Sequence, residues 1–289
     1  MFSAIARVFR TPDLRRKIAF TLGIIAIYRL GAHVPTPFVS YPNVQDCLQQ
    51  TGSASEGLLS LVNLFSGGAL LQLSIFALGV MPYITATIIV QLLRVVIPHF
   101  ETLYKEGQAG QAKLTQYTRY LTIALALLQS TTLVTVARSG QLFGTTSIAS
   151  CNSLLTNDAW WAQLLMIITL TAGTGLIMWF AELVTERGVG NGMSILIFTS
   201  IAATFPAAMW AIAQARSFEV FLLVLAVSIV VVALVVFVEQ SQRRIPVQYA
   251  KRMVGRRTLG GTNTYIPIKV NMAGVVPVIF ASSLLYIPA

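Results

Sequence analysis

The side chains that most often do covalent or metal chemistry are scattered through this chain. His33 and His99 each stand alone, and no set of cysteines and histidines has the spacing of metal ligands. The carboxylates fall in polar stretches or at the ends of apolar runs, never as a pair inside one. Because a catalytic or metal site needs several such groups held together, the sequence predicts no enzyme activity, no cofactor and no metal site.

The loop Glu186–Gly192, with the sequence ERGVGNG, is the nearest approach to a nucleotide-binding motif. Its glycine spacing matches neither the dinucleotide fingerprint nor the Walker motif, and no strand precedes it. A tight turn between two membrane spans, with Asn191 and Ser194 as helix caps, accounts for the loop better. We therefore expect no phosphate site there.

The composition of the chain is strongly apolar, and this determines which kind of secondary structure must hold these residues in place. Of the 289 residues, 55% are hydrophobic and only 10% are charged, whereas about a quarter are charged in soluble domains. A membrane span needs ~20 apolar residues, and the chain offers about seven such runs. We predict an all-α polytopic membrane protein, with Pro82 kinking the second span. The predicted spans are Ile18–Val34, Leu70–Ile97, Tyr120–Ala137, Trp160–Ala181, Met193–Ala213, Glu219–Val238 and one that begins near Asn271.

The basic residues fall mainly on one side of these spans. The formal net charge is +10, and of the 20 Lys and Arg residues only Arg29, Arg138 and Arg216 fall near the other side. Positive residues concentrate in cytoplasmic segments, so residues 1–17 are predicted to be cytoplasmic and the chain to cross the cell (cytoplasmic) membrane several times. Near the outer end of the first span, the long side chain of Arg29 is expected to snorkel to the interface.

Cys47 and Cys151 both fall in outward-facing loops on this topology. An oxidising exterior permits a disulfide, but the two residues lie far apart in the sequence. We therefore expect two unpaired thiols, with a bridge between them as the alternative.

The stretch Leu58–Leu70 makes a poor membrane span. It is short, it contains Asn63 and Ser66, and it ends in Gly67-Gly68, a pair that permits a sharp turn. Non-helical backbone is tolerated at membrane depth only inside protein or beside a water-filled cavity. A short half-polar helix hinged by glycines onto a full span therefore indicates a funnel or pore, with this segment lying in it.

Four sequence motifs are characteristic of one family. They are FSGGAL followed by SIFALGVMPYITATIIVQLL, VTERGVGNGMSI at 184–195, QRRIPVQYAKR at 242–252 and KVNMAGVVPVIFASS at 269–283. Over nearly its whole length, and in order, the chain resembles the bacterial SecY family of protein-conducting channels. Members of that family have ten spans, so the resemblance implies a C-terminally truncated chain. Residues 18–213 would form the N-terminal half, and residues 214–289 the start of the C-terminal half.

The resemblance implies a plug and a pore ring. The plug would lie at 57–70, around Asn63, Leu64, Phe65, Ser66, Gly67 and Gly68. The apolar constriction ring would include Val80, Ile84, Met193, Ile197 and Ile279. Spacing alone does not distinguish these aliphatic residues from ordinary helix packing, so the assignment rests on the motif match.

Three polar residues lie inside apolar spans: Thr85, Gln129 and Asn271. Polar groups there often form hydrogen bonds between helices, each worth about 0.6 kcal/mol. In ordinary packing they hold spans together. In a SecY-like channel they would line the lateral gate between spans two, three and seven, a seam that must open.

The long loop Gln240–Val270 is basic and has strand-like ends. IPVQYAK and NTYIPIKV flank the turn-prone GRRTLGG, so we predict a basic ribbon that projects into the cytoplasm. A cluster that only sets topology and binds anionic lipid is the alternative. The resemblance implies a docking site for the ribosome or the SecA motor, with Arg256 and Arg257 near the tip as the main contacts. The other predicted contacts are Arg243, Arg244, Lys251 and Arg252.

The resemblance as a whole implies a passive channel for unfolded, signal-bearing preproteins, with lateral release of membrane proteins into lipid. The implied partners are SecE, SecG, the SecA ATPase and the ribosome, with no small-molecule substrate. A secondary transporter with a broken helix at 57–70 is the alternative. Ion-coupled transporters usually keep ionisable residues at the bilayer midplane, whereas Glu182 and Glu186 lie at a span end or in a loop, which counts against it.

Overall fold

The computed structural model describes residues 11–51, 63, 66–139, 154–157, 159–215, 218–247, 252–254, 257–259 and 264–271. The chain divides into two compact units. The first comprises Met1–Ala207 together with Phe280–Ala289, and the second comprises Ala208–Ile279.

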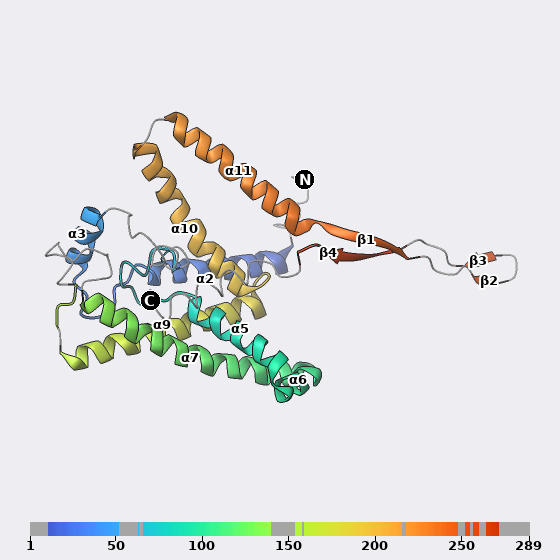
Figure 1. Cartoon of the computed structure of the whole chain (residues 1–289), viewed down its shortest axis with the longest axis horizontal. Helices are drawn as coiled ribbons and strands as arrows, with labels where there is room; N and C mark the ends of the chain where they lie inside the picture. Colours follow the sequence, from blue (N-terminus) through green and yellow to red (C-terminus); the bar gives the residue numbers. More distant parts are fainter. Residues whose placement is uncertain are drawn as a thin grey trace. The chain divides into compact units, whose positions relative to one another are not determined.

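The first unit is built from helices, most of which follow the predicted apolar runs, whereas two short ones lie in connections expected to be loops. They are α2 (Pro12–Gly31), α3 (Tyr41–Thr51), α5 (Met81–Val96), α6 (Pro98–Lys105), α7 (Gln108–Arg138), α9 (Trp160–Arg187) and the greater part of α10 (Gly192–Ala215) (Figure 1). Among the described residues, α7, α9, α10 and α11 (Phe218–Gln240) are long and apolar enough to cross a membrane, and the bent pair of α5 and α6 adds a fifth if it counts as one span. Charged side chains near both ends of α2, such as Arg16 and Arg29, keep it out of this set.

Small and polar side chains fill the interfaces between helices, as membrane packing favours. α7 packs against α5 and α9, and its buried face carries Thr122, Ala126 and Ser130. The Ser130 hydroxyl lies 3.3 Å from the hydroxyl of Thr171 on α9. Large apolar side chains such as Leu128 point outward from the same helix and are exposed. This inside-out pattern suits helices surrounded by lipid.

A bidentate ion pair also joins α7 to α9. Arg119 Nε and Nη2 lie 2.8 Å from the two carboxylate oxygens of Glu182. Nearby, α6 folds back on the start of α7, where a side chain at Gly110 would overlap the carbonyl oxygen of Leu103. The predicted connection between the second and third spans is thus largely helical.

The helix of the second span is shorter than predicted. It begins at Met81 rather than Leu70, and Pro82 lies in its first turn, where a missing N–H has no partner to lose. The expected kink at Pro82 is therefore wrong. The sharp bend falls instead between α5 and α6, which meet at 101°, because Ile97 precedes a proline and is extended, with φ −105° and ψ 116°.

The second unit carries the predicted ribbon. After α11, strand β1 (Gln242–Val247) pairs antiparallel with β4 (Thr264–Lys269). Farther out, β2 (Arg252–Val254) pairs antiparallel with β3 (Arg257–Leu259). Figure 1 shows both pairs extending away from the end of α11. The strand prediction for this loop is confirmed.

Candidate functional site

A buried and largely non-helical stretch, Ser66–Val80, leads from the predicted plug into α5; we call it the buried connector. Leu70, Leu73 and Phe76 are among its buried side chains. Its backbone takes positive φ at Gly67 and three later positions. Backbone of this kind is tolerated at membrane depth only where its polar groups find partners.

The segment that follows α2 supplies those partners. The carbonyl oxygen of Leu73 accepts the backbone N–H of Thr36 at 3.0 Å and the Thr36 hydroxyl at 2.9 Å. The N–H of Ile75 donates to the carbonyl oxygen of Val34 at 2.9 Å. Turns within the stretch add further bonds, such as the one from the N–H of Ala77 to the carbonyl oxygen of Ser74 at 2.9 Å. Turn bonds and a short β-like pairing with a distant segment therefore take the place of helical hydrogen bonds.

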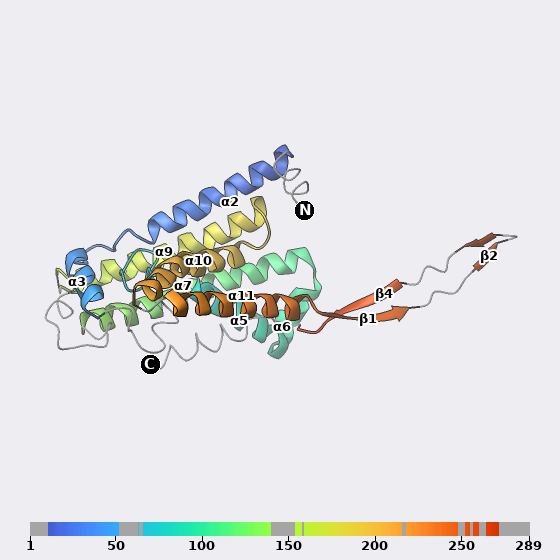
Figure 2. The ribbon, with the colours of Figure 1, turned by 90° about the horizontal axis from the view of Figure 1, so that it is seen from above.

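Aromatic packing fixes the middle of the buried connector between two helices. The ring of Phe76 stacks on Tyr28 of α2, with centroids 5.8 Å apart. It also meets Phe180 of α9 edge to face at 6.5 Å. Figure 2 shows α2 running along α9, and the two helices are in contact.

Glycines on both helices make room for this packing. A side chain at Gly31 of α2 would overlap the ring of Phe76. A side chain at Gly173 of α9 would overlap the carbonyl oxygen of Ile75. The close approach of the buried connector therefore depends on the absence of a Cβ at two helical positions.

The sharp turn predicted at Gly67-Gly68 is confirmed. Gly67 and Gly68 have φ of +68° and +87°, which only glycine adopts readily. The N–H of Gly68 donates to the carbonyl oxygen of Asn63 at 3.0 Å. Two predicted plug residues, Leu64 and Phe65, lie outside the described residues.

Asn63 and Ser66 have a role that sequence reasoning missed. The Ser66 hydroxyl accepts the N–H of Leu70 at 3.1 Å, and Asn63 Oδ1 accepts the N–H of Leu71 at 3.4 Å. Both side chains thus close the turn at the hinge. Short polar residues beside a glycine pair are the signal that predicts such turns.

The predicted pore-ring residues occupy the first turns of two helices. Val80 caps α5 and Ile84 lies one turn later, and both are buried. Met193 and Ile197 lie one turn apart at the start of α10 and are half-buried. Ile279 lies outside the described part of the chain.

The predicted tight turn at Glu186–Gly192 is confirmed and is shorter than that motif, since α9 ends at Arg187 and α10 begins at Gly192. Asn191 Oδ1 accepts the N–H of Met193 at 3.0 Å, so Asn191 caps α10 as expected, whereas Ser194 lies inside the helix. The N–H of Val189 reaches the hydroxyl of Thr21 on α2 at 3.3 Å. The turn therefore packs on α2.

The three predicted lateral-gate residues have different surroundings. Thr85 is buried, and its hydroxyl donates to Met81 of its own helix at 3.0 Å. Gln129 is buried on α7. The Asn271 side chain donates to Glu239 at the end of α11 at 3.3 Å. Neither of these two hydrogen bonds joins spans two and seven, and the gate stays a prediction.

The long strands of the ribbon expose basic residues. Arg243 and Arg244 are exposed on β1, and the Arg244 guanidinium lies 4.8 Å from the ring centroid of Tyr265 on the paired strand. Arg252 and Arg257 belong to the outer pair of strands. The remaining predicted contacts, Lys251 and Arg256, lie outside the described residues.

The expectation of two unpaired thiols is wrong, because Cys47 is in a disulfide. Cys47 is buried on α3; Cys151 lies outside the described residues. Two backbone hydrogen bonds bring neighbouring segments together, from Ser40 to the carbonyl oxygen of Leu154 and from Thr156 to that of Phe38, each 2.9 Å long. The spacing of the cysteines in the sequence does not predict that these two segments lie side by side.

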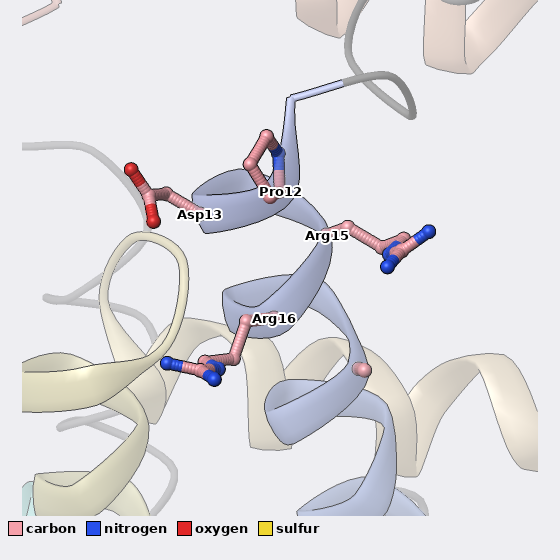
Figure 3. Close-up of a pocket in the computed structure, with 5 residues that line it drawn as sticks. Pro12, Asp13, Arg15 and Arg16 are labelled. Carbon is pink, nitrogen blue, oxygen red and sulfur yellow. The ribbon is translucent and has the colours of Figure 1, made fainter.

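A cavity of about 330 Å³ lies at the first turns of α2, lined by Pro12, Asp13, Arg15, Arg16 and Ala19. Figure 3 shows Arg15 pointing away from Asp13. These first turns are exposed and far along α2 from the buried connector. Within the described residues, no three His, Cys, Asp or Glu side chains are grouped so as to hold a metal ion.

The sequence comparisons identify a single family. A sequence model of the SecY family matches residues 74–289. Protein translocase subunit SecY of Streptomyces scabiei is 64% identical over 293 residues, which cover 100% of this chain and 66% of the relative. The SecY subunit of Mycobacterium tuberculosis is 57% identical over 289 residues, covering 100% and 65%. The chain therefore spans about two thirds of the length of these relatives.

The structural comparisons agree on the fold. The structure of a protein-conducting channel superposes with a TM-score of 0.56 at 18% identity, covering 93% of this chain and 56% of that one. Sec61 from the canine ribosome-channel complex gives the same score, identity and coverage. The predicted SecY-like helical fold is thus confirmed. With its signature motifs in order and a family match across most of its length, the chain belongs to the SecY family.

Proposed function

We propose that this chain forms part of the central subunit of the Sec translocon, a passive channel for unfolded, signal-bearing polypeptides across the cytoplasmic membrane. The observation that carries the proposal is the buried connector. Its irregular backbone has partners on other segments of the chain, and it ends at Val80, the first predicted ring residue. Backbone of this kind is tolerated at membrane depth only inside protein or beside a water-filled cavity, and proteins that move substrates across membranes use it near their binding paths, which supports a channel.

Val80, Ile84, Met193, Ile197 and Ile279 would seal that path. Apolar walls offer water and ions no hydrogen bonds, so a narrow ring excludes them by dewetting. The short aliphatic side chains still leave room for an extended polypeptide when the ring widens. Burial of Val80 and Ile84 supports a tight closed state on the α5 side.

The plug would rest against this ring and swing away about Gly67-Gly68. Its turn is closed by the polar side chains of Asn63 and Ser66, which suit a segment that is alternately buried and wet. Thr85, Gln129 and Asn271 would line the seam through which apolar segments leave for the lipid. Weak polar contacts suit a seam that must open.

Partner proteins would supply the energy for transport and deliver the polypeptides to the channel. The ribbon would dock the ribosome or the SecA ATPase through its arginines, since Arg binds both phosphate and carboxylate oxygens. SecE and SecG would complete the channel. One solved relative, Sec61, was determined in a ribosome-channel complex, which favours ribosome docking here. The proposed subunit has no enzyme activity of its own, and residues 1–17 would be cytoplasmic.

The test uses a full-length SecY subunit whose first 289 residues are this sequence. It is reconstituted with SecE, SecG and SecA, and the import of a fluorescent preprotein into proteoliposomes is followed. We expect ATP-dependent import only when the preprotein carries a signal sequence. A stable, correctly inserted subunit that imports nothing would overturn the proposal.

A further inference from the structure

Arg29, in the last turn of α2, contacts the plug hinge directly. Its Nη1 donates a hydrogen bond of 2.9 Å to the carbonyl oxygen of Gly67. The side chain is half-buried. The expectation of a snorkelling side chain missed this contact, which gives the guanidinium a specific partner inside the protein.

The other side of the hinge is closed by α10. A Cβ at Gly67 would lie 3.2 Å from Cα and 3.3 Å from the carbonyl oxygen of Ser200. Ser200 is itself tied to α2, because its hydroxyl lies 2.7 Å from that of Tyr28. The Ser200 hydroxyl donates to Leu196 at 3.0 Å, so Tyr28 is the donor in the pair. The hinge glycine is thus held between two helices that are bonded to each other.

Electrostatics makes the Arg29 contact stronger than an ordinary turn hydrogen bond. A guanidinium is always charged, and charge-assisted hydrogen bonds are about twice as strong as neutral ones. The ion pairs found among the described residues, Lys105–Glu101 and Arg119–Glu182, do not include Arg29. Within that part of the chain, the Gly67 carbonyl is therefore the contact that compensates the half-buried charge.

We propose that Arg29 is a latch that holds the plug hinge in its closed position. This inference rests on the proposed function, because it presumes that the plug leaves when a polypeptide enters. Rotation about Gly67-Gly68 carries the Gly67 carbonyl away from α2 and breaks the bond, so the bond favours the closed state. Arg29 acts through the hinge and needs no contact with the passing chain, which makes it a positioning residue.

The test measures the resting conductance of the reconstituted full-length channel in planar bilayers. Arg29→Met removes charge and donor, Arg29→Gln keeps one donor group, and Arg29→Lys keeps the charge. We expect conductance to rise in the order Lys, Gln, Met, reaching about tenfold for Met, which corresponds to about 1.4 kcal/mol. Arg15→Met, the same change at the exposed start of α2, should leave conductance unchanged. If one Arg29 variant fails to accumulate, the other two carry the comparison.

A plug deletion separates the latch from a general structural role. In a channel that lacks Asn63–Gly68, resting conductance is already raised, and Arg29→Met should add nothing to it. An equal rise on both backgrounds would overturn the latch, as would Arg29 variants that stay as ion-tight as the parent. Preprotein import by the parent channel is measured alongside, so a failure of the proposed function is seen there and is distinct from a failure of the latch.

Discussion

The buried connector and the basic ribbon are both non-helical, yet they satisfy their backbones in different ways. Besides its own turns, the buried connector needs partners from a distant segment, as in the two hydrogen bonds from Thr36 to the carbonyl oxygen of Leu73. The ribbon pairs with itself, β1 with β4 and β2 with β3. Side chains of its long strands, including Arg243 and Arg244, are left exposed.

The difference follows from the surrounding solvent. Inside a membrane, each unpaired N–H or carbonyl group costs several kcal/mol. An irregular segment is therefore stable there only where neighbouring segments provide hydrogen-bond partners. In water an unpaired edge is tolerated, and prolines or charges keep it from pairing with other chains. Pro246 and Pro267 lie in the two long ribbon strands. Substitutions should therefore affect stability at the buried connector and binding at the ribbon.

The largest effect is expected at Gly173. The change Gly173→Ala places a methyl group against the carbonyl oxygen of Ile75 and should lower the free energy of unfolding by about 3 kcal/mol. On the same helix, a Cβ at Gly175 meets nothing within 4 Å, so Gly175→Ala should be neutral or stabilising by about 0.5–1 kcal/mol. Thermal unfolding of the two purified variants in detergent measures both. Equal behaviour would contradict the close packing of the buried connector on α9.

The next effect concerns the end of the buried connector. The change Ile84→Asn puts an amide into a buried apolar turn, at a cost of about 1–3 kcal/mol if it stays unpaired. Water retained by the amide should raise resting conductance about tenfold and admit preproteins with defective signal sequences. Ile84→Leu keeps the site apolar and is the control. If the Asn variant has the same resting conductance as the Leu variant, Ile84 is an ordinary packing residue and not part of a seal.

Reversal of two ribbon charges should alter binding and leave folding intact. Arg256→Glu with Arg257→Glu is expected to weaken binding of SecA or ribosomes to proteoliposomes by roughly tenfold, and docking on ribosomal RNA should weaken steeply with added salt. The unfolding temperature should not change. The paired Lys variants keep the charge and should retain most of the binding. Unchanged binding across a salt series would leave the ribbon as a topology signal only.

The smallest effect is expected from one hydroxyl. The change Thr36→Val removes the side-chain donor to the Leu73 carbonyl but keeps the backbone donor, so the loss should be about 1 kcal/mol. On α7 the hydroxyl of Thr132 is exposed and bonds within its own helix, and Thr132→Val should change stability little. Thermal unfolding compares the two. An equal loss of stability at Thr132 would show that the hydrogen bond from Thr36 to the buried connector matters no more than a hydroxyl bond within a helix.

The sequence by itself determined the features that depend on local composition. Apolar runs predicted both ends of α10 and α11 within a few residues, whereas α7 begins well before the predicted Tyr120 and α9 extends beyond the predicted Ala181. Strand-like composition on both sides of a glycine-rich turn predicted the ribbon, and Gly67-Gly68 predicted a sharp turn. Each of these features depends on residues that are neighbours in the sequence, either through hydrophobicity or through allowed φ values. The sequence alone is therefore enough to predict them.

Only the tertiary structure decided which distant groups meet. Composition extended the second span back to Leu70, because apolar residues fit a buried irregular segment as well as a helix. Hydrogen bonds from the segment after α2 make the irregular form stable and let α5 begin at Met81. Arg29 on the hinge and the disulfide-bonded Cys47 have the same origin. Their partners are set by how segments pack across the fold, and no local pattern in the sequence encodes that.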